Sequence, residues 1–446
     1  MSRGLVNILI VIIIGFLATP IPINSEGIDL GLSLDNVSNV AIEENSSTTV
    51  VDNSTDNYVF NGILNSNLNP KTLKLVIQSI DTELQTADTP EFFLELVSSS
   101  GQSKEFSPLT YEYEGFDDNT KTYTYNIDIS KETLNVDSGF YKIYLKSNSS
   151  ELSETLNIEE HVQYLTDVQY IGSEDKVSKS KMYLKLYLPT KDLKYTVPVS
   201  RINPYSNVII RRTMNAITEG AKENSGLYQG DYLPYASSLK FRKDNITVNF
   251  YSRNLEMYKD NSILSNIAVK SLADTLTNIT WLPEVERINV TVDKKPSKDY
   301  FNGYDLTGPI EKNNKVQLYL PYETDSYLYL LPQDANISND EINDLFDNLK
   351  MSRPDFMSLI PEDVNLISYF FEENTLILNL SADPTESYAN RPDIANMIVE
   401  SILFTYTELD NIESVKINVS NSNVVTMGTY NIQEALKAPN FINVEK

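Results

Sequence analysis

The chain has 446 residues, with 36 Lys and Arg against 62 Asp and Glu, one His and no Cys, so its formal net charge is -26. The missing Cys excludes a thiolate nucleophile, a Cys-ligated zinc or iron–sulfur site and any disulfide. Because His161 is the single histidine, one chain cannot form a Ser-His-Asp triad or a multi-histidine metal site by itself. The excess of negative charge repels phosphate backbones and argues against nucleic acid as a partner. We expect no cofactor and no metal.

Residues 1–25 begin with the apolar run MSRGLVNILIVIIIGFLATPIPI. Such a run reaches across most of a bilayer core of about 30 Å, and its densest part also resembles the apolar region of a signal peptide. We therefore expect a signal peptide or an N-terminal membrane anchor, and the choice stays open. Arg3 precedes the run and no Lys or Arg follows before Lys71, which places the rest of the chain outside the cytoplasm. Without Cys after the run, a lipid anchor is not expected.

Residues 26–57 are rich in Ser, Asn, Thr and acids, which predicts a disordered linker. Residues 58–160 then show short segments of alternating apolar and polar residues, separated by Pro, Gly, Asp and Asn, as is typical of an antiparallel β-sandwich. The run Asp-Ser-Gly-Phe-Tyr at 137–141 resembles the tyrosine corner of immunoglobulin-like domains. We therefore predict an all-β, Ig-like sandwich, followed by a connector in which His161 is a partly exposed boundary residue.

The C-terminal half contains an internal repeat. The segment LYLP occurs at Leu186–Pro189 and at Leu318–Pro321, an offset of 132 residues. Two later matches, ITVNF with LILNL and INV with INV, have offsets of 130 and 129. Near-constant offsets indicate a duplicated domain, predicted to span residues 179–309 and 314–437.

Both copies have the same order of predicted elements: an extended pair of segments, a first helix, a turn with Pro, two strands, a second helix and a last strand. In the second copy, the long helix has its apolar face at Ile394, Met397, Ile398 and Ile402, spaced as in an amphipathic helix. The prediction is an α+β fold in which two helices cover one face of a small sheet.

These segments resemble the GerM domain of bacterial sporulation and spore germination proteins. The likeness rests on IPEDVNLISYFFEENTLILNLS, SILFTYTEL and NIESVKINV in copy two, and on YLPYASSLKFRKDNITVNFYS with a closing FNGYDLTGP in copy one. The resemblance implies exported, ring-building-motif-like domains that assemble between mother cell and forespore, with no established enzymatic activity. The closing G-x-D pattern is clear at Gly303 and Asp305 but not at Gly428, so the second copy is expected to end differently.

Other patterns that suggest catalysis have simpler explanations. The acid pairs at 117–118, 362–363 and 372–373 lie at predicted turns, where solvated acids are common. Ser178 and Lys181 fit an S-x-x-K pattern, but the companion motifs of penicillin-binding proteins are missing. We therefore expect no enzyme activity; a secreted hydrolase that uses carboxylates alone has no specific motif to support it.

The charge is uneven along the chain. Residues 161–309 contain 20 basic and 16 acidic residues, whereas 26–160 contain 7 and 24, and 310–446 contain 8 and 22. The basic first copy therefore suggests an interaction surface made of Lys179, Lys181, Lys185, Lys191, Lys194, Arg211 and Arg212. It could bind an acidic domain of a second molecule, balance acidic neighbours in the same chain, or attract anionic wall polymers.

The sequence favours a non-enzymatic, extracytoplasmic scaffold in sporulation or germination, anchored at the membrane or secreted. The alternative is an envelope module that binds peptidoglycan. The expected partners are other envelope or sporulation-complex proteins, the membrane through the N-terminal segment, and either a second copy of the chain or peptidoglycan.

Overall fold

The computed structural model describes residues 58–79, 91–98, 101–106, 109–147, 158–296, 299–335, 337, 341–351, 353–420 and 422–445. The predicted signal peptide or anchor and the predicted linker lie outside these residues. Within them, no helix combines the length and apolar character needed to span a membrane.

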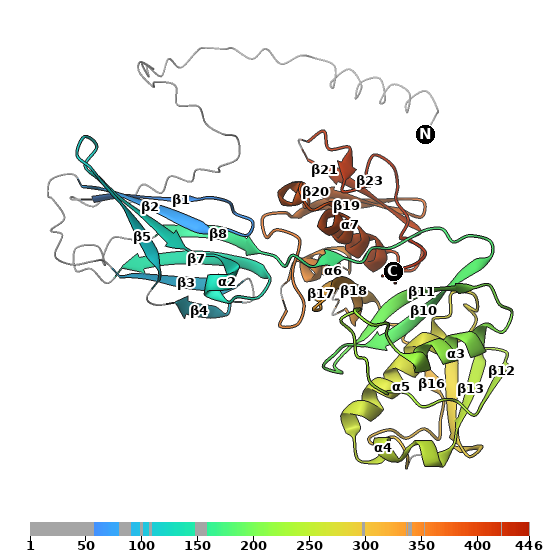
Figure 1. Ribbon diagram of the computed structural model, residues 1–446. Coiled ribbons are helices and arrows are strands. Elements are labelled where there is room, and N and C mark those ends of the chain that lie inside the picture. Colours follow the sequence, from blue (N-terminus) through green and yellow to red (C-terminus); the bar gives the residue numbers. More distant parts are fainter. Residues whose placement is uncertain are drawn as a thin grey trace, which may run out of the picture. The chain divides into compact units, whose positions relative to one another are not determined.

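The first described strands form two antiparallel sheets of four strands each, with orders β1-β2-β6-β5 and β4-β3-β7-β8 (Figure 1). Alternation turns one face of each sheet inward, so that Leu75 and Ile77 of one sheet and Leu94 and Leu145 of the other share one buried core. A one-turn helix, α2 (Lys131–Leu134), precedes β7. The strands are β1 (Tyr58–Leu64), β2 (Thr72–Ser79), β3 (Phe92–Ser98), β4 (Ser103–Phe106), β5 (Tyr111–Asp117), β6 (Thr122–Asp128), β7 (Gly139–Ser147) and β8 (Ile158–Tyr164).

Two details concern residues singled out in the sequence. The Tyr141 hydroxyl donates a hydrogen bond to the carbonyl oxygen of Asp137 at 3.1 Å, which closes the Asp-x-Gly-x-Tyr run on itself. His161 is exposed, and the prediction of a connector was wrong. It lies within β8 opposite Lys142, because the strand continues past residue 160 to Tyr164.

The duplicated part shows the same series of elements twice (Figure 1). The first repeat contains β10 (Lys181–Pro189), β11 (Thr196–Pro204), α3 (Ile209–Glu219), β12 (Ser238–Arg242), β13 (Asn245–Phe250), α5 (Ser262–Thr277) and β14 (Arg287–Val292). The second contains β17 (Gln317–Glu323), β18 (Tyr327–Asp334), α6 (Glu341–Lys350), β19 (Leu366–Glu372), β20 (Thr375–Leu380), α7 (Pro392–Tyr406) and β21 (Ser414–Val419).

Short elements complete the two repeats. The first also has η1 (Ser252–Asn254), α4 (Glu256–Lys259), β15 (Lys295–Pro296) and β16 (Ile310–Glu311), and the second has η2 (Glu386–Tyr388), β22 (Thr426–Met427) and β23 (Tyr430–Asn431). The strand β9 (Gln169–Tyr170) precedes both repeats and pairs in parallel with β18.

The prediction of a single sheet per repeat was wrong, because the strands belong to two sheets. The hairpin β10–β11 is separate from the sheet that contains β12, β13 and β14, and the hairpin β17–β18 is separate from β19, β20 and β21. The long helix links them, since α5 contacts both β10 and β14, and α7 contacts both β17 and β21. The parallel pairs β13–β14 and β20–β21 are joined through these helices, as parallel strands require.

Side chains of the long helix explain why the hairpin stays separate. In the first repeat, Ser271 donates to the carbonyl oxygen of Tyr187, and the Tyr187 N–H donates to Thr275 Oγ1 at 2.9 Å. The second repeat has the same arrangement: Ser401 donates to the carbonyl oxygen of Tyr319, and the Tyr319 N–H donates to Thr405 Oγ1 at 3.0 Å. The tyrosine of each LYLP segment thus bonds to helix side chains, which take the place of a neighbouring strand.

The hydrogen bonds of the Tyr187 backbone with the Ser271 and Thr275 side chains, called the clamp below, allow the effect of a single substitution to be predicted. Thr275→Val keeps the shape of the side chain but leaves the buried Tyr187 N–H without an acceptor, so we expect a loss of about 1–3 kcal/mol in the free energy of unfolding. The single tryptophan, Trp281, donates from Nε1 to the Tyr183 carbonyl oxygen in β10, so its fluorescence during urea unfolding reports on this repeat. Thr277→Val is the matched control, because Thr277 bonds within its own helix to the Ala273 carbonyl oxygen. An equal loss in both variants would contradict the role given to the clamp.

The two repeats end in similar turns, although their sequences differ. Gly303 and Gly428 both have positive φ, 86° and 57°. Each turn contacts an asparagine of its long helix: the Tyr304 hydroxyl donates to Asn266 Oδ1, and the Thr429 N–H donates to Asn396 Oδ1 at 2.7 Å. The blurred G-x-D pattern of the second repeat therefore keeps the glycine and the helix contact while losing the aspartate.

Residues 441–445 return from the second repeat and join the two hairpins (Figure 1). The fully buried Asn443 side chain donates to the carbonyl oxygens of Pro198 in β11 and Leu330 in β18, at 2.7 and 2.8 Å. Its Oδ1 accepts from the Leu330 N–H at 3.0 Å. Since β11 and β18 belong to separate sheets, this amide supplies hydrogen bonds that no strand supplies between the repeats.

A buried ion pair fixes the same segment to the first repeat. The Arg201 guanidinium bonds to both carboxylate oxygens of Glu445, at 2.6 and 2.9 Å, and also to the Gly220 carbonyl oxygen at 2.7 Å. Both residues are buried, with 8% and 7% of their surface exposed. A charged pair in this position requires its partner, because neither charge can reach bulk water.

Candidate functional site

The structure places the predicted basic residues in three different settings. Lys191 and Lys194 lie in the turn between β10 and β11 and pair with acids of the second repeat, Asp325 and Asp355. The Lys194–Asp355 distance is 3.3 Å, and Lys194 also lies 3.6 Å from Asp192. These side chains are largely exposed, so each ion pair adds little to the free energy of unfolding and mainly favours one orientation of the two repeats.

Lys185 differs from the others because it is partly buried. Its ammonium lies 5.6 Å from the centre of the Tyr187 ring, and burial lowers its pKa. Lys179 and Lys181 are exposed before and at the start of β10, and Arg211 and Arg212 are exposed on α3. The seven residues therefore do not form one patch: two bind the neighbouring repeat, one is partly buried, and four face solvent.

Asp274 on α5 is a titratable group close to the repeat interface. Burial raises its pKa to about 6, against opposing attraction from Lys270 and a hydrogen bond from the Thr196 hydroxyl at 3.3 Å. Asp334, which further raises the pKa, and Lys185, which lowers it, also act on this carboxyl.

This shift gives a prediction with a definite sign. A carboxyl with a raised pKa binds its proton more tightly when folded, so stability falls as pH rises from about 4 to about 6. We expect Asp274→Asn to raise the free energy of unfolding by about 2 kcal/mol at pH 7.5 and to leave it nearly unchanged at pH 4. Urea unfolding at the two pH values checks this, with the exposed Glu219→Gln as control. A gain of equal size at both pH values would contradict it.

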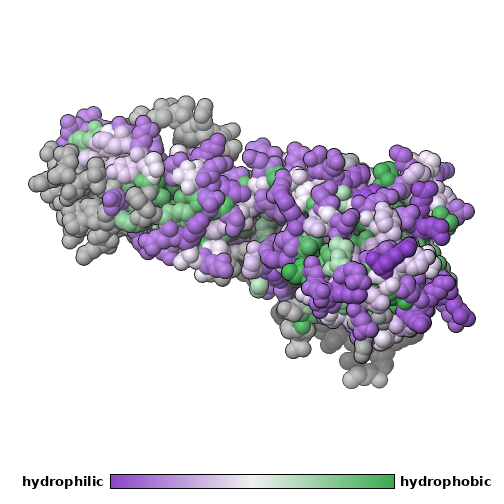
Figure 2. Space-filling model, turned by 60° about the horizontal axis from the view of Figure 1, so that its bottom comes forward, coloured by the Kyte–Doolittle hydropathy of each residue, from purple (hydrophilic) through white to green (hydrophobic). Residues whose placement is uncertain are grey.

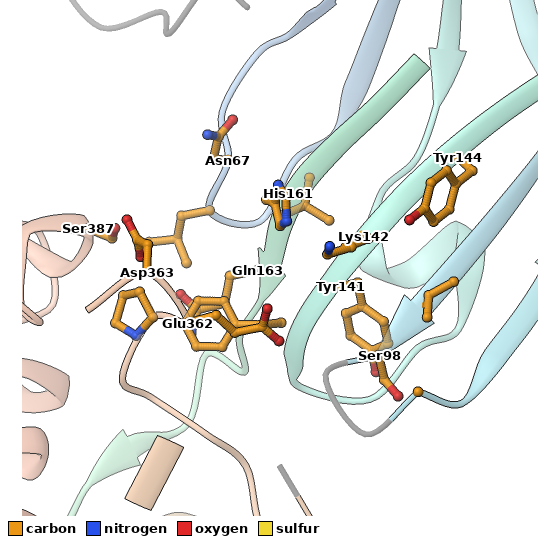
Figure 3. A pocket seen from close by; sticks show the side chains of 16 residues that line it. Asn67, Ser98, Tyr141, Lys142, Tyr144, His161, Gln163, Glu362, Asp363 and Ser387 are labelled. Carbon is orange, nitrogen blue, oxygen red and sulfur yellow. The ribbon is translucent and has the colours of Figure 1, made fainter. Parts of the chain in front are cut away.

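A cavity of about 840 Å³ lies between the β7–β8 face of the sandwich and the turn before β19. Figure 3 shows Lys142, Tyr141 and His161 from β7 and β8 on one side, with Glu362 and Asp363 on the other. The acid pair at 362–363 thus lies at a turn, as predicted, and also lines this cavity.

Gln163 gives this cavity a specific polar feature. Its Nε2 donates to the Tyr388 hydroxyl at 2.5 Å, which fixes the orientation of the amide because that hydroxyl donates to the Leu359 carbonyl oxygen. Its Oε1 is buried and accepts no hydrogen bond from the protein. The rest of the lining combines the rings of Tyr141 and Tyr144 with the charged side chains of Lys142, Glu362 and Asp363.

No other arrangement suggests catalysis among the described residues. The pairs at 117–118 and 372–373 lie at strand ends, and Ser178 and Lys181 are exposed at the start of the first hairpin. In this part of the chain, no three His, Cys, Asp or Glu residues lie close enough to hold a metal. The face shown in Figure 2 is mainly hydrophilic, with small separate hydrophobic areas.

The Germane family, described as sporulation and spore germination, matches residues 311–425. The chain carries a Germane domain. The match covers the second repeat from β17 to β21, and it confirms the resemblance drawn from IPEDVNLISYFFEENTLILNLS and the segments after it. No curated protein sequence matches the chain.

Several solved structures are similar to this chain. The tandem GerMN domains of the sporulation protein GerM from Bacillus subtilis are 16% identical, with 60% of this chain and 100% of that chain covered and a TM-score of 0.43. The first GerMN domain of the same protein is 16% identical, covering 28% and 96%, with a TM-score of 0.22. A putative lipoprotein from Clostridium perfringens is 17% identical, covering 34% and 95%, with a TM-score of 0.21.

Proposed function

We propose that this protein is a non-enzymatic scaffold or assembly protein of sporulation or spore germination that acts outside the cytoplasm. The Germane domain at residues 311–425 carries this proposal, since its family is described by that process and not by a reaction. The linked repeats support it further. Asn443 and the Arg201–Glu445 pair hold them together, so their surfaces are presented at a fixed spacing.

The sandwich is assigned to the Ig-like class in this proposal. Its strand order matches the A-B-E-D and C-F-G sheets of that class when β4 is taken as an additional edge strand. The Tyr141 hydrogen bond to Asp137 and the fully buried Ile143 also support the assignment. Ig-like modules commonly present loops and strand edges for binding, which suits an assembly protein.

The proposed place of action is the envelope, in a complex between mother cell and forespore. The apolar residues 1–25 support membrane anchoring or secretion, and the exposed Lys179, Lys181, Arg211 and Arg212 offer a basic surface for acidic partners. Deleting the gene is expected to block sporulation or germination while leaving vegetative growth normal. Expression throughout growth, with normal spores after deletion, would overturn the proposal.

A second candidate function, binding to peptidoglycan, is favoured by the cavity beside Gln163. The Tyr141 and Tyr144 rings that line the cavity provide apolar surface, and Lys142, Glu362 and Asp363 provide hydrogen-bonding groups, which sugar recognition uses. Co-sedimentation with purified sacculi tests this function. Retention that Tyr144→Ala weakens, and that exposed Glu219→Gln does not, would favour it over the scaffold.

A further inference from the structure

The equivalent hairpins of the two repeats differ in charge. The strand β12 ends at Arg242 and is followed by Lys243, and β19 ends at Glu372 and is followed by Glu373, at the corresponding positions 130 residues later. Both turns have the same backbone form, since Lys243 and Glu373 have φ values of 56° and 53°. The same structural position is therefore basic in one repeat and acidic in the other.

Both first strands of these hairpins lie at sheet edges. In the described part of the chain, β12 pairs only with β13, and β19 pairs only with β20. An edge strand presents unpaired backbone N–H and C=O groups, so it is a ready template for a strand of another molecule.

The edge strand β19 also exposes large apolar side chains. Ile367, Phe370 and Phe371 are 58%, 43% and 54% exposed, and Phe241 in β12 is 41% exposed. Phe371 lies opposite the buried Leu376 of β20 and therefore on the same face of the sheet, yet it remains uncovered. Proteins usually protect exposed edge strands from pairing with other molecules. In β12 and β19, the charged residues at the ends of the hairpins can supply this protection.

We propose that β12 of one molecule pairs with β19 of a second copy in parallel, so that the two sheets join edge to edge. This inference rests on the proposed scaffold function and names its partner as a second copy of the chain. Parallel pairing brings Arg242 and Lys243 beside Glu372 and Glu373, whereas antiparallel pairing would separate them. Parallel pairing of β12 with β12, or of β19 with β19, places like charges together and is disfavoured. Because the two surfaces differ, each molecule keeps one free edge and the contact extends into a chain of molecules.

The absence of Cys allows a direct test by disulfide trapping. Parallel pairing of two equivalent edges turns one sheet over, so Lys240, which lies opposite Thr247, and Phe371, which lies opposite Leu376 on the other face of its own hairpin, point to the same side of the joined sheet. Neighbouring strands lie about 4.8 Å apart, within reach of a disulfide. The full-length chain with Lys240→Cys and Phe371→Cys is expected to form a ladder of dimers, trimers and longer species on mild oxidation, seen by non-reducing gel electrophoresis. Each single variant is expected to run as a monomer on the same gel, because it lacks one half of the disulfide. A monomeric double variant, or single variants that dimerise equally well, would overturn the proposal.

Charge reversal provides the second test. Arg242→Glu with Lys243→Glu makes both hairpins acidic, and Glu372→Lys with Glu373→Lys makes both basic. Each variant alone is expected to associate at least about tenfold more weakly in sedimentation experiments, and an equal mixture of the two is expected to associate again. This recovery would not occur if the variants were simply misfolded. The control Lys294→Glu with Lys295→Glu reverses two exposed charges at the β14–β15 turn of the same sheet and should have no effect.

The two proposals fail in different ways. Chains that stay monomeric, while deletion of the gene blocks sporulation, would overturn the strand pairing alone. Chains that form the disulfide ladder, while deletion leaves sporulation and germination normal, would overturn the scaffold function alone.

Discussion

Replacing Asn443 by Ala is expected to lower the free energy of unfolding of the duplicated part by about 3–5 kcal/mol. The substitution removes three buried hydrogen bonds and leaves the carbonyl oxygen of Pro198 and both backbone groups of Leu330 without these partners. It also places Ala at a φ of 48°, which asparagine tolerates better. Trp281 fluorescence during urea unfolding measures the effect in the first repeat.

Asn443→Gly separates the two causes. Glycine adopts a positive φ without strain but makes none of the three side-chain hydrogen bonds. If the hydrogen bonds dominate, the glycine variant should lose most of what the alanine variant loses. A glycine variant as stable as the natural chain would show that backbone conformation, and not the link between β11 and β18, explains the requirement for asparagine.

The duplicated elements could be predicted because their signals are local. Alternation in β13 and β20 and the helical spacing of Ile394, Met397 and Ile398 identify buried faces without knowledge of the rest of the chain. The prediction of a single sheet per repeat was wrong because the sequence pattern lacks one kind of information. Apolar spacing does not show that Ser271 and Thr275 bond to the backbone of Tyr187, and these bonds occupy the position that another strand would need.

The link formed by residues 441–445 gives no comparable signal. This segment has no helical or strand periodicity, and its contacts join residues 113 and 245 positions apart, so only the folded chain brings them together. The basic surface shows the same difficulty in part. Composition shows where the lysines lie in the sequence, but whether Lys191 and Lys194 are free of acidic partners depends on where the second repeat places Asp325 and Asp355. One local signal was available for the edge strands: the opposite charges at two turns separated by the repeat offset.

Glu445→Ala is expected to destabilise the first repeat by about 3–5 kcal/mol, because it leaves the buried Arg201 guanidinium without its counter-charge. Burial alone would raise the pKa of Glu445, but its hydrogen bonds and its attraction to Arg201 and Lys222 outweigh burial and hold the pKa below the ordinary value. The pair therefore stabilises the fold at pH values above the ordinary pKa of a glutamate. This stabilisation decreases as the pH falls toward the lowered pKa of Glu445. The loss in Glu445→Ala should accordingly be largest near neutral pH and smaller in acid, as urea unfolding at pH 7 and pH 3.5 would show.

The double variant Arg201→Met with Glu445→Leu distinguishes an unpaired charge from lost packing. It removes both charges and keeps apolar volume, so it should be more stable than Glu445→Ala even though it changes more atoms. The Gly220 carbonyl oxygen also loses the hydrogen bond from Arg201 in this variant, so full recovery is not expected. A double variant less stable than Glu445→Ala would mean that the guanidinium, through its bonds to the end of α3, contributes more than its pairing with the carboxylate. In that case α3 would hold residues 441–445 in place, and these residues would not be what holds α3.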